Sequence, residues 1–336
     1  MRKLIYLLFV LIIFSLHLHS QKKSDFNIKA PDIKIENSKY ATLHYIESRP
    51  DPENLGMSYV NKWNGVQAVT LNQPVEDQLQ LLFPQLISSV THDAGTLALQ
   101  MRVLFFEPFT SETKGKGLAR LRMTLYKKEN EKYLFLNTID TLIVDGNMDA
   151  RPAAGEVITA FIADNLQYEP YEDEEVFNIS QVMDIDVYEK NSIPFFLQSD
   201  IPDGIYYKYN SLKNLTPDDT SEIRITKGDE EKIKEVKIPD PEKPGKEKKL
   251  KQKEIYAFVY KGVPYIGYEG DFYPASFNDG FWSFKISYKT SGGFSIGIGV
   301  GASGRSFGGG GGVRIPIGGK KETAEIFIDH LNGEFF

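Results

Sequence analysis

Residues 281–300 read FWSFKISYKTSGGFSIGIGV, and this stretch decides the fold of the C-terminal half of the chain. Large apolar residues occupy every second position from 282 to 288 and again from 294 to 300. Such alternation is typical of a strand with one buried face. Folding the chain at residues 290–292 brings both apolar faces to the same side, the condition that fixes the register of a hairpin. The predicted pairs are Tyr288 with Phe294, Ile286 with Ile296, Phe284 with Ile298 and Trp282 with Val300.

The second run of this hairpin has small residues on its other face: Ser295, Gly297, Gly299 and Gly301. Glycine inside a strand costs about 0.5–1 kcal/mol relative to alanine, and it usually marks the close approach of another backbone, ring or partner. Val313, Ile315 and Ile317 can add a third strand, so we expect a glycine-rich three-stranded meander. The candidate partner-binding residues are this glycine row and strand aromatics, namely Gly297, Gly299, Gly301, Trp282, Tyr265 and Tyr268.

The rest of the C-terminal half indicates further strands. Residues 255–260 and 263–268 flank Lys261-Gly262, a dipeptide that suits a two-residue hairpin turn. Before them, residues 239–254 consist almost entirely of Pro, Lys, Glu and Gly, a composition that buries too little apolar surface to order itself. We therefore expect a mostly β domain over residues 180–336, with a disordered or exposed insertion at 239–254.

The N-terminal half mixes strand and helix patterns. Several stretches before residue 145 have strand character, and Arg120–Tyr126 alternates polar and apolar side chains throughout. Residues 75–90 place apolar side chains on one helical face, and Pro84 inside this pattern is expected to kink the helix. Residues 153–166 form a second helical pattern. The order predicts an α+β domain over residues 40–168, an antiparallel sheet with two helices on one face.

Residues 1–20 have the layout of a secretory signal peptide. Arg2 and Lys3 precede an apolar run, Leu4–Phe14, that is too short to span a bilayer, and small or polar residues follow. The chain has no cysteine, which excludes disulfides and a lipoprotein anchor and suits an oxidising cell envelope. We expect an exported protein without a transmembrane segment, periplasmic or extracellular or peripheral to the outer membrane. Its net charge of −7 argues against a nucleic-acid partner.

Two catalytic motifs match by composition alone. Residues 299–304 fit G-x-G-x-x-G and residues 304–308 fit G-x-S-x-G. Both motifs require a helix to open directly after the loop, whereas five consecutive glycines follow Phe307, and glycine is a poor helix former. Asp329 and His330 are neighbours on a predicted strand, so their side chains are expected to point to opposite faces. We predict no cofactor and no catalytic residue.

One stretch has the spacing of a calcium-binding loop. The positions that supply oxygen ligands are filled by Asp145, Asn147, Asp149 and Glu156. Ala150 stands where the sharp turn requires glycine, and a strand precedes the loop in place of a helix. The alternative, which we favour, is a polar turn in which Asp149 caps the second helix. We predict no other metal site, because no second ligand stands at metal spacing from the histidines outside the leader, His44, His92 and His330.

Several short motifs are shared with a group of bacterial proteins. They are Asn54–Val60, Asp203–Tyr206, Glu325–Phe327, Asn332–Glu334 and the glycine-rich Ile315–Gly319. These motifs resemble segments of uncharacterised secreted proteins of Gram-negative bacteria, and the resemblance touches about half of the chain that follows the leader. It implies an envelope location and assigns neither an activity nor a catalytic residue.

These features favour a non-catalytic exported protein that binds another envelope component, protein or glycan, through its β-sheet surfaces. Two alternatives remain open. The first is a secreted hydrolase that uses paired carboxylates, because the 46 acidic residues offer many pairs. The second is a structural subunit whose exposed strands pair with copies of itself in a homo-oligomer.

Overall fold

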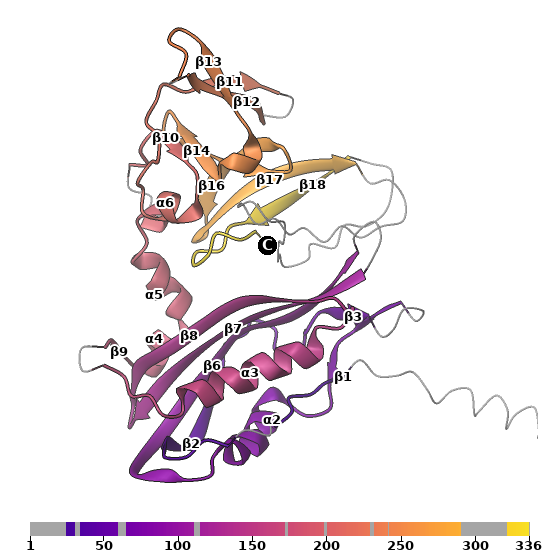
Figure 1. Ribbon diagram of the computed structural model, residues 1–336, viewed down its shortest axis with the longest axis vertical. Helices are drawn as coiled ribbons and strands as arrows, with labels where there is room; N and C mark the ends of the chain where they lie inside the picture. The colour runs from indigo at the N-terminus through magenta and orange to yellow at the C-terminus, as the bar shows by residue number, and fades with distance from the viewer. Residues whose placement is uncertain are drawn as a thin grey trace, which may run out of the picture. The chain divides into compact units, whose positions relative to one another are not determined.

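The computed structural model describes residues 25–30, 34–59, 65–110, 115–171, 174–197, 200–228, 232–240, 242–289 and 321–335 (Figure 1). The expected leader, residues 1–20, lies outside these ranges. The chain divides into two compact units. Unit 1 comprises Met1–Tyr126 and Leu136–Glu169, and unit 2 comprises Lys127–Phe135 and Pro170–Phe336.

One five-stranded sheet organises the N-terminal half. Its order is β2 (Ser38–Glu47), β6 (Val90–Thr110), β7 (Gly115–Glu129), β8 (Lys132–Asp145) and β9 (Val176–Phe177). The prediction of an antiparallel sheet is wrong for its first pair, because β2 and β6 run parallel. A parallel pair needs a crossover connection of a dozen residues or more, and residues 48–89, which include a helix, provide it. Two short pairs accompany this sheet: β1 (Asp25–Phe26) with β5 (Thr70–Leu71), and β3 (Met57–Tyr59) with β4 (Val66–Ala68).

Two helices supply the other layer of unit 1 where the apolar patterns predict them, although the first pattern, residues 75–90, is helical only as far as Leu86 and Val90 begins β6 (Figure 1). Helix α2 (Val75–Leu82) passes into the 3-10 turn η1 (Phe83–Leu86) at Pro84, which has no N–H for the helical ladder. Helix α3 (Arg151–Asn165) is the second. The buried side chains of both helices form one cluster with the inward side chains of β6 and β7. Both helices therefore cover the same face of the sheet.

Unit 2 is built mainly from short antiparallel strands. Three successive hairpins turn at Lys261-Gly262, Glu269-Gly270 and Asp279-Gly280, and both residues of each turn have positive φ. This backbone twist matches that of the flanking strands, so the predicted hairpin at Lys261-Gly262 is confirmed. The strands are β10 (Gly204–Tyr206), β11 (Arg224–Lys227), β12 (Ile233–Pro239), β13 (Glu247–Leu250), β14 (Ala257–Tyr260), β15 (Val263–Tyr268), β16 (Asp271–Asn278), β17 (Phe281–Lys289) and β18 (Lys321–Phe327).

The predicted insertion at 239–254 is mostly exposed, but part of it forms regular structure. Strand β13 pairs antiparallel with β12, and Gln252–Glu254 form the 3-10 turn η3. Backbone hydrogen bonds to a strand do not require apolar side chains, and one buried residue, Leu250, anchors the end of β13 in the core. Composition alone therefore underestimated the order of this segment.

Strand β17 buries Trp282, Phe284 and Ile286 on one face, as the alternation predicts, and Ser283 on its other face is buried as well. Its neighbours at Phe284 are β16 on one edge and β18 on the other, through Ala275 and Ile326. The predicted partner strand at 294–300, and with it the glycine-rich meander, lies outside the described residues.

Short helices lead into unit 2, a feature that the strand patterns did not predict. They are α4 (Ile179–Met183), α5 (Ile185–Asn191), the 3-10 turn η2 (Pro194–Leu197) and α6 (Tyr209–Lys213). Strands still predominate over helices across the described residues. Within those same ranges, none of the helices combines the length and the apolar character needed to cross a bilayer.

Candidate functional site

The aromatic residues predicted to bind a partner pack inside unit 2. Trp282 stacks on Phe195 with ring centroids 4.5 Å apart, and its indole N–H donates to the Phe195 carbonyl oxygen at 2.9 Å. Tyr268 is 1% exposed and contacts the rings of Phe284 and Phe335. These side chains therefore serve the core of the unit.

Of the remaining predicted partner-binding residues, Tyr265 is half-buried. Its ring stacks on Phe258 at 4.9 Å. Gly297, Gly299 and Gly301 lie outside the described residues, so their role stays a prediction.

The residues of the calcium-loop hypothesis form a turn between β8 and α3. The N-cap position of α3 is Ala150, without a side-chain bond, while the Asp149 carboxylate accepts the backbone N–H of Arg151, the first residue of the helix, at 3.1 Å. Both carboxylate oxygens of Asp149 also accept from the Arg151 guanidinium, at 2.8 and 2.9 Å. Glu156 is exposed on α3. The Arg151 guanidinium already occupies the Asp149 oxygens that calcium would need. The calcium site stays a prediction.

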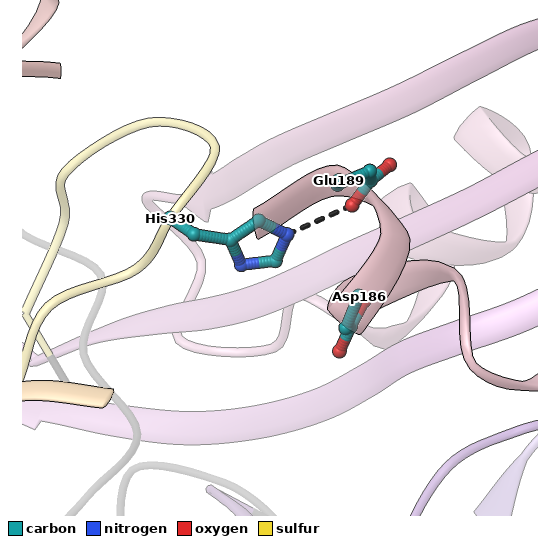
Figure 2. Close-up of side chains that lie close together, drawn as sticks. All are labelled: Asp186, Glu189 and His330. Atoms are coloured by element: carbon teal, nitrogen blue, oxygen red, sulfur yellow. Dashed lines mark hydrogen bonds and ion pairs between the residues drawn. The ribbon is translucent and has the colours of Figure 1, made fainter. Parts of the chain in front are cut away.

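A different group of ligand-type side chains comes together in unit 2 (Figure 2). Asp186 and Glu189 lie three residues apart on α5, and His330 lies in the loop that follows β18. His330 is 3% exposed, and its Nε2 lies 2.8 Å from the Glu189 Oε2. One ligand atom from each of the three side chains lies within 4.8 Å of the other two. We call these residues the Asp186–Glu189–His330 cluster.

The loop that carries His330 is closed by a β-bridge and stabilised by two tyrosine hydroxyl groups. A β-bridge joins Ile328 to Phe335, whose ring is fully buried. The hydroxyl of Tyr209 donates to the His330 carbonyl oxygen at 2.8 Å, and that of Tyr256 donates to the Gly333 carbonyl oxygen at 2.8 Å. This C-terminal loop, residues 328–335, therefore fixes the backbone from which the imidazole extends.

Asp329 belongs to the same loop, so the prediction that Asp329 and His330 lie on a strand is wrong. The Asp329 carboxylate accepts the Leu331 N–H at 2.9 Å and so stabilises the turn. The bridge between Ile328 and Phe335 folds the chain back directly after β18, because Phe335 is drawn into the core.

A lysine adds positive charge beside the cluster. The Lys190 ammonium lies 3.6 Å from the centroid of the Phe281 ring. Burial lowers the pKa of Lys190, while the nearby carboxylates of Asp186, Asp329 and Glu189 act in the opposite direction. The site thus combines one imidazole, several carboxylates and one amine at the junction of α5 and the C-terminal loop.

Sequence reasoning missed this cluster, because Glu189 and His330 are 141 residues apart. The one local signal is the spacing of Asp186 and Glu189, which places both carboxylates on one helical face. Chemically, an imidazole nitrogen beside carboxylate oxygens can share a proton or hold a divalent cation.

Comparison with known proteins gives little further guidance. No family model matches the chain, and no curated protein matches it. Among solved structures, the chain is similar to a DUF330 protein from Xanthomonas campestris, with 13% identity over 42% of this chain and 91% of that one. The TM-score is 0.27, a likeness too weak to assign a fold or a function.

Proposed function

We propose that this chain is an exported, non-catalytic protein of the bacterial cell envelope and that it binds another envelope protein. The signal-peptide layout of residues 1–20 and the shared motifs support the location. We place the contact on helices α4 and α5, since the β-sheet aromatics Trp282 and Tyr268 are enclosed in the core.

The observation that carries this proposal is a line of exposed apolar side chains on α4 and α5. Ile179, Met183 and Val187 recur every four residues and are 42%, 46% and 56% exposed. Side chains four apart lie on the same face of a helix, which places Ile179 and Met183 together on α4. Asp184, with φ −99° and ψ 22°, ends α4 and caps α5, and Val187 follows in the first turn of α5. We call Ile179, Met183 and Val187 the α4–α5 strip.

The chemistry of the strip favours a protein partner over a glycan. Aliphatic side chains and methionine offer apolar contact area and few hydrogen bonds, which suits the centre of a protein interface. Contiguous exposed apolar surface often marks such an interaction site. Exposed Glu175 and Asp184 flank the strip, so the matching surface is expected to have a basic rim.

A photo-crosslinking amino acid at Val187, in the native bacterium, tests the proposal. We expect one predominant crosslinked partner protein, lost in a Met183→Asp background. The same probe at Leu81, which is exposed on α2 of unit 1, is the matched control and should not capture that protein. Equal capture at both positions, or none at Val187, would contradict the proposed contact.

The two alternatives are distinguished by different observations. A self-assembling subunit would crosslink to its own copies, and its sedimentation coefficient would rise with concentration. A hydrolase needs a carboxyl group with a raised pKa as its acid. Among the described residues, three carboxyl groups have a shifted pKa, and in each the pKa is lowered: Glu47, Asp93 and Glu235. Burial raises the pKa of Glu47, but its hydrogen bonds outweigh this effect, and hydrogen bonds also lower the pKa of the other two groups.

The location is tested separately from the contact. We expect the intact mass of the chain from the envelope fraction to correspond to a start near Gln21. A chain that retains residues 1–20 in the cytoplasm would contradict export, whatever the crosslinking shows.

A further inference from the structure

The Asp186–Glu189–His330 cluster has the donors that zinc takes when a chain contains no cysteine. Its three ligand atoms, one nitrogen and two oxygens, lie within 4.8 Å of one another. Zinc binds imidazole nitrogen and carboxylate oxygen at about 2.0–2.2 Å, so ligand atoms around a tetrahedral ion lie about 3.4 Å apart. Because Asp186 is exposed, a rotation of its side chain can bring the third oxygen to this separation.

Two of the three donors already contact each other (Figure 2). The hydrogen bond between His330 Nε2 and Glu189 Oε2, at 2.8 Å, aims both ligand atoms at each other. Metal binding requires neutral imidazole and ionised carboxylate and releases protons. A cation that displaces the proton between these atoms moves them apart, from 2.8 Å to about 3.4 Å.

The burial of His330 is an observation independent of the carboxylates. The hydroxyl groups of Tyr209 and Tyr256 hold the backbone of the closed loop from which its imidazole extends. A ligand that is locked in position before the metal arrives loses little conformational entropy on binding. Exposed carboxylates on a helix do not by themselves provide such an anchor.

The geometry points to a zinc site that joins α5 to the C-terminal loop, with His330 and Glu189 as inner ligands and Asp186 as the third. The exposed side of Asp186 leaves the fourth position to water. Calcium and magnesium prefer all-oxygen sites, whereas imidazole suits zinc. The site goes beyond the proposed partner contact, which rests on the apolar face of α4 and α5.

Isothermal titration of the purified, metal-free chain with zinc chloride tests this inference. We expect one zinc ion per chain and at least about tenfold weaker binding in Asp186→Asn, because even residues outside the inner ligand set contribute about 10- to 100-fold. Asp164→Asn is the matched control, since Asp164 is an exposed helical aspartate on α3. It should bind zinc like the wild type.

Nuclear magnetic resonance of the imidazole groups identifies the ligand directly. Outside residues 1–20 the chain has three histidines, and zinc should shift the ring nitrogens of His330 and not those of His44 or His92. Absence of zinc binding, equal binding by wild type and Asp186→Asn, or equal losses in both aspartate variants would overturn the site. The last outcome would mean adventitious binding to surface carboxylates.

Glu189→Gln supplies a second variant that keeps the shape of the side chain. Circular dichroism of each metal-free variant separates a lost ligand from a lost fold. Because Asp186 is exposed, its asparagine variant should keep the wild-type spectrum. The crosslinking at Val187 is scored separately, so failure of one proposal does not imply failure of the other.

Discussion

Two buried tyrosines of unit 2 show how one hydroxyl group can have opposite effects on stability. The Tyr256 hydroxyl donates to the Gly333 carbonyl oxygen at 2.8 Å, while within the described residues no hydrogen bond of good geometry reaches the buried Tyr268 hydroxyl, which lies near the Glu269 carboxylate. A buried polar group without a partner costs about 1–3 kcal/mol. Tyr268→Phe should therefore leave the free energy of unfolding unchanged or raise it, whereas Tyr256→Phe should lower it by about 1–2 kcal/mol. Urea unfolding midpoints measure both, and a clear loss in Tyr268→Phe would show that its hydroxyl is bonded.

Gly333 is the residue on which the C-terminal loop most directly depends. Its φ is +74°, and a Cβ at this position would overlap the ring of Tyr209. Gly333→Ala should therefore lower the free energy of unfolding by about 2 kcal/mol or more. Gly280→Ala is the control, because Gly280 has a similar φ of +80° and nothing within 4 Å of an added Cβ. Gly280→Ala should lower the free energy of unfolding by only about 1 kcal/mol, the cost of a side chain on a backbone with positive φ. If both variants lost the same free energy of unfolding, Tyr209 would have moved aside.

At the scale of elements, the end of β2 carries a charge network that should make stability depend on pH. Glu47 accepts from the Arg49 guanidinium at 2.6 and 2.8 Å and from the Tyr45 hydroxyl at 2.8 Å. Burial alone would raise the pKa of Glu47, but these bonds outweigh it, and the pKa lies below its ordinary value of 4.5. A lowered pKa contributes stability that is present above the unfolded value and lost as pH falls through the folded one.

Glu47→Gln tests this dependence. At pH 7 it should lower the free energy of unfolding by about 1–3 kcal/mol. The difference from wild type should shrink as pH falls below the ordinary glutamate value and the wild-type carboxyl becomes protonated. Glu53→Gln, an exposed control, should match the wild type at every pH. A difference that persists at acid pH would mean that shape rather than charge explains the effect.

The elements differ in how far sequence could predict them. Strand β7 and the hairpin turn at Lys261-Gly262 followed from local periodicity and turn chemistry, which act over a few residues. Helix α4 carries a readable local signal, the capping box of Asn178 and Gln181, that strand-based reasoning passed over. The order of β13 depends on pairing with β12, a contact that composition does not contain.

The candidate site was beyond sequence reasoning for a related reason. Its key contact joins α5 to a loop that is closed by Phe335, far along the chain. The spacing of Asp186 and Glu189 is readable, but nothing local distinguishes it from the many solvated acidic pairs on helices. The aromatic residues offered as partner contacts illustrate the converse, since alternation predicts a buried face and not what covers it.

At the scale of the whole molecule, the chain has separate hydrophobic cores, one beneath α2 and α3 and others among the strands of unit 2. We propose that the units also unfold separately. Leu121→Ala, in the core of unit 1, and Phe284→Ala, in a core of unit 2, each leave a cavity worth about 2–5 kcal/mol. For units of this size that corresponds to a fall of roughly 5–15 °C in the melting temperature of the affected unit.

Scanning calorimetry distinguishes separate from joint unfolding. If each unit is stabilised by its own core, Leu121→Ala should lower the melting temperature of one transition and Phe284→Ala that of the other. In each variant the melting temperature of the second transition should stay unchanged. A single transition that falls equally in both variants would show that the cores melt as one cooperative structure. Zinc adds a further criterion. Because its proposed ligands all lie in unit 2, the ion should raise the melting temperature only of the transition that Phe284→Ala lowers. A rise in the other transition would place the bound metal elsewhere on the chain.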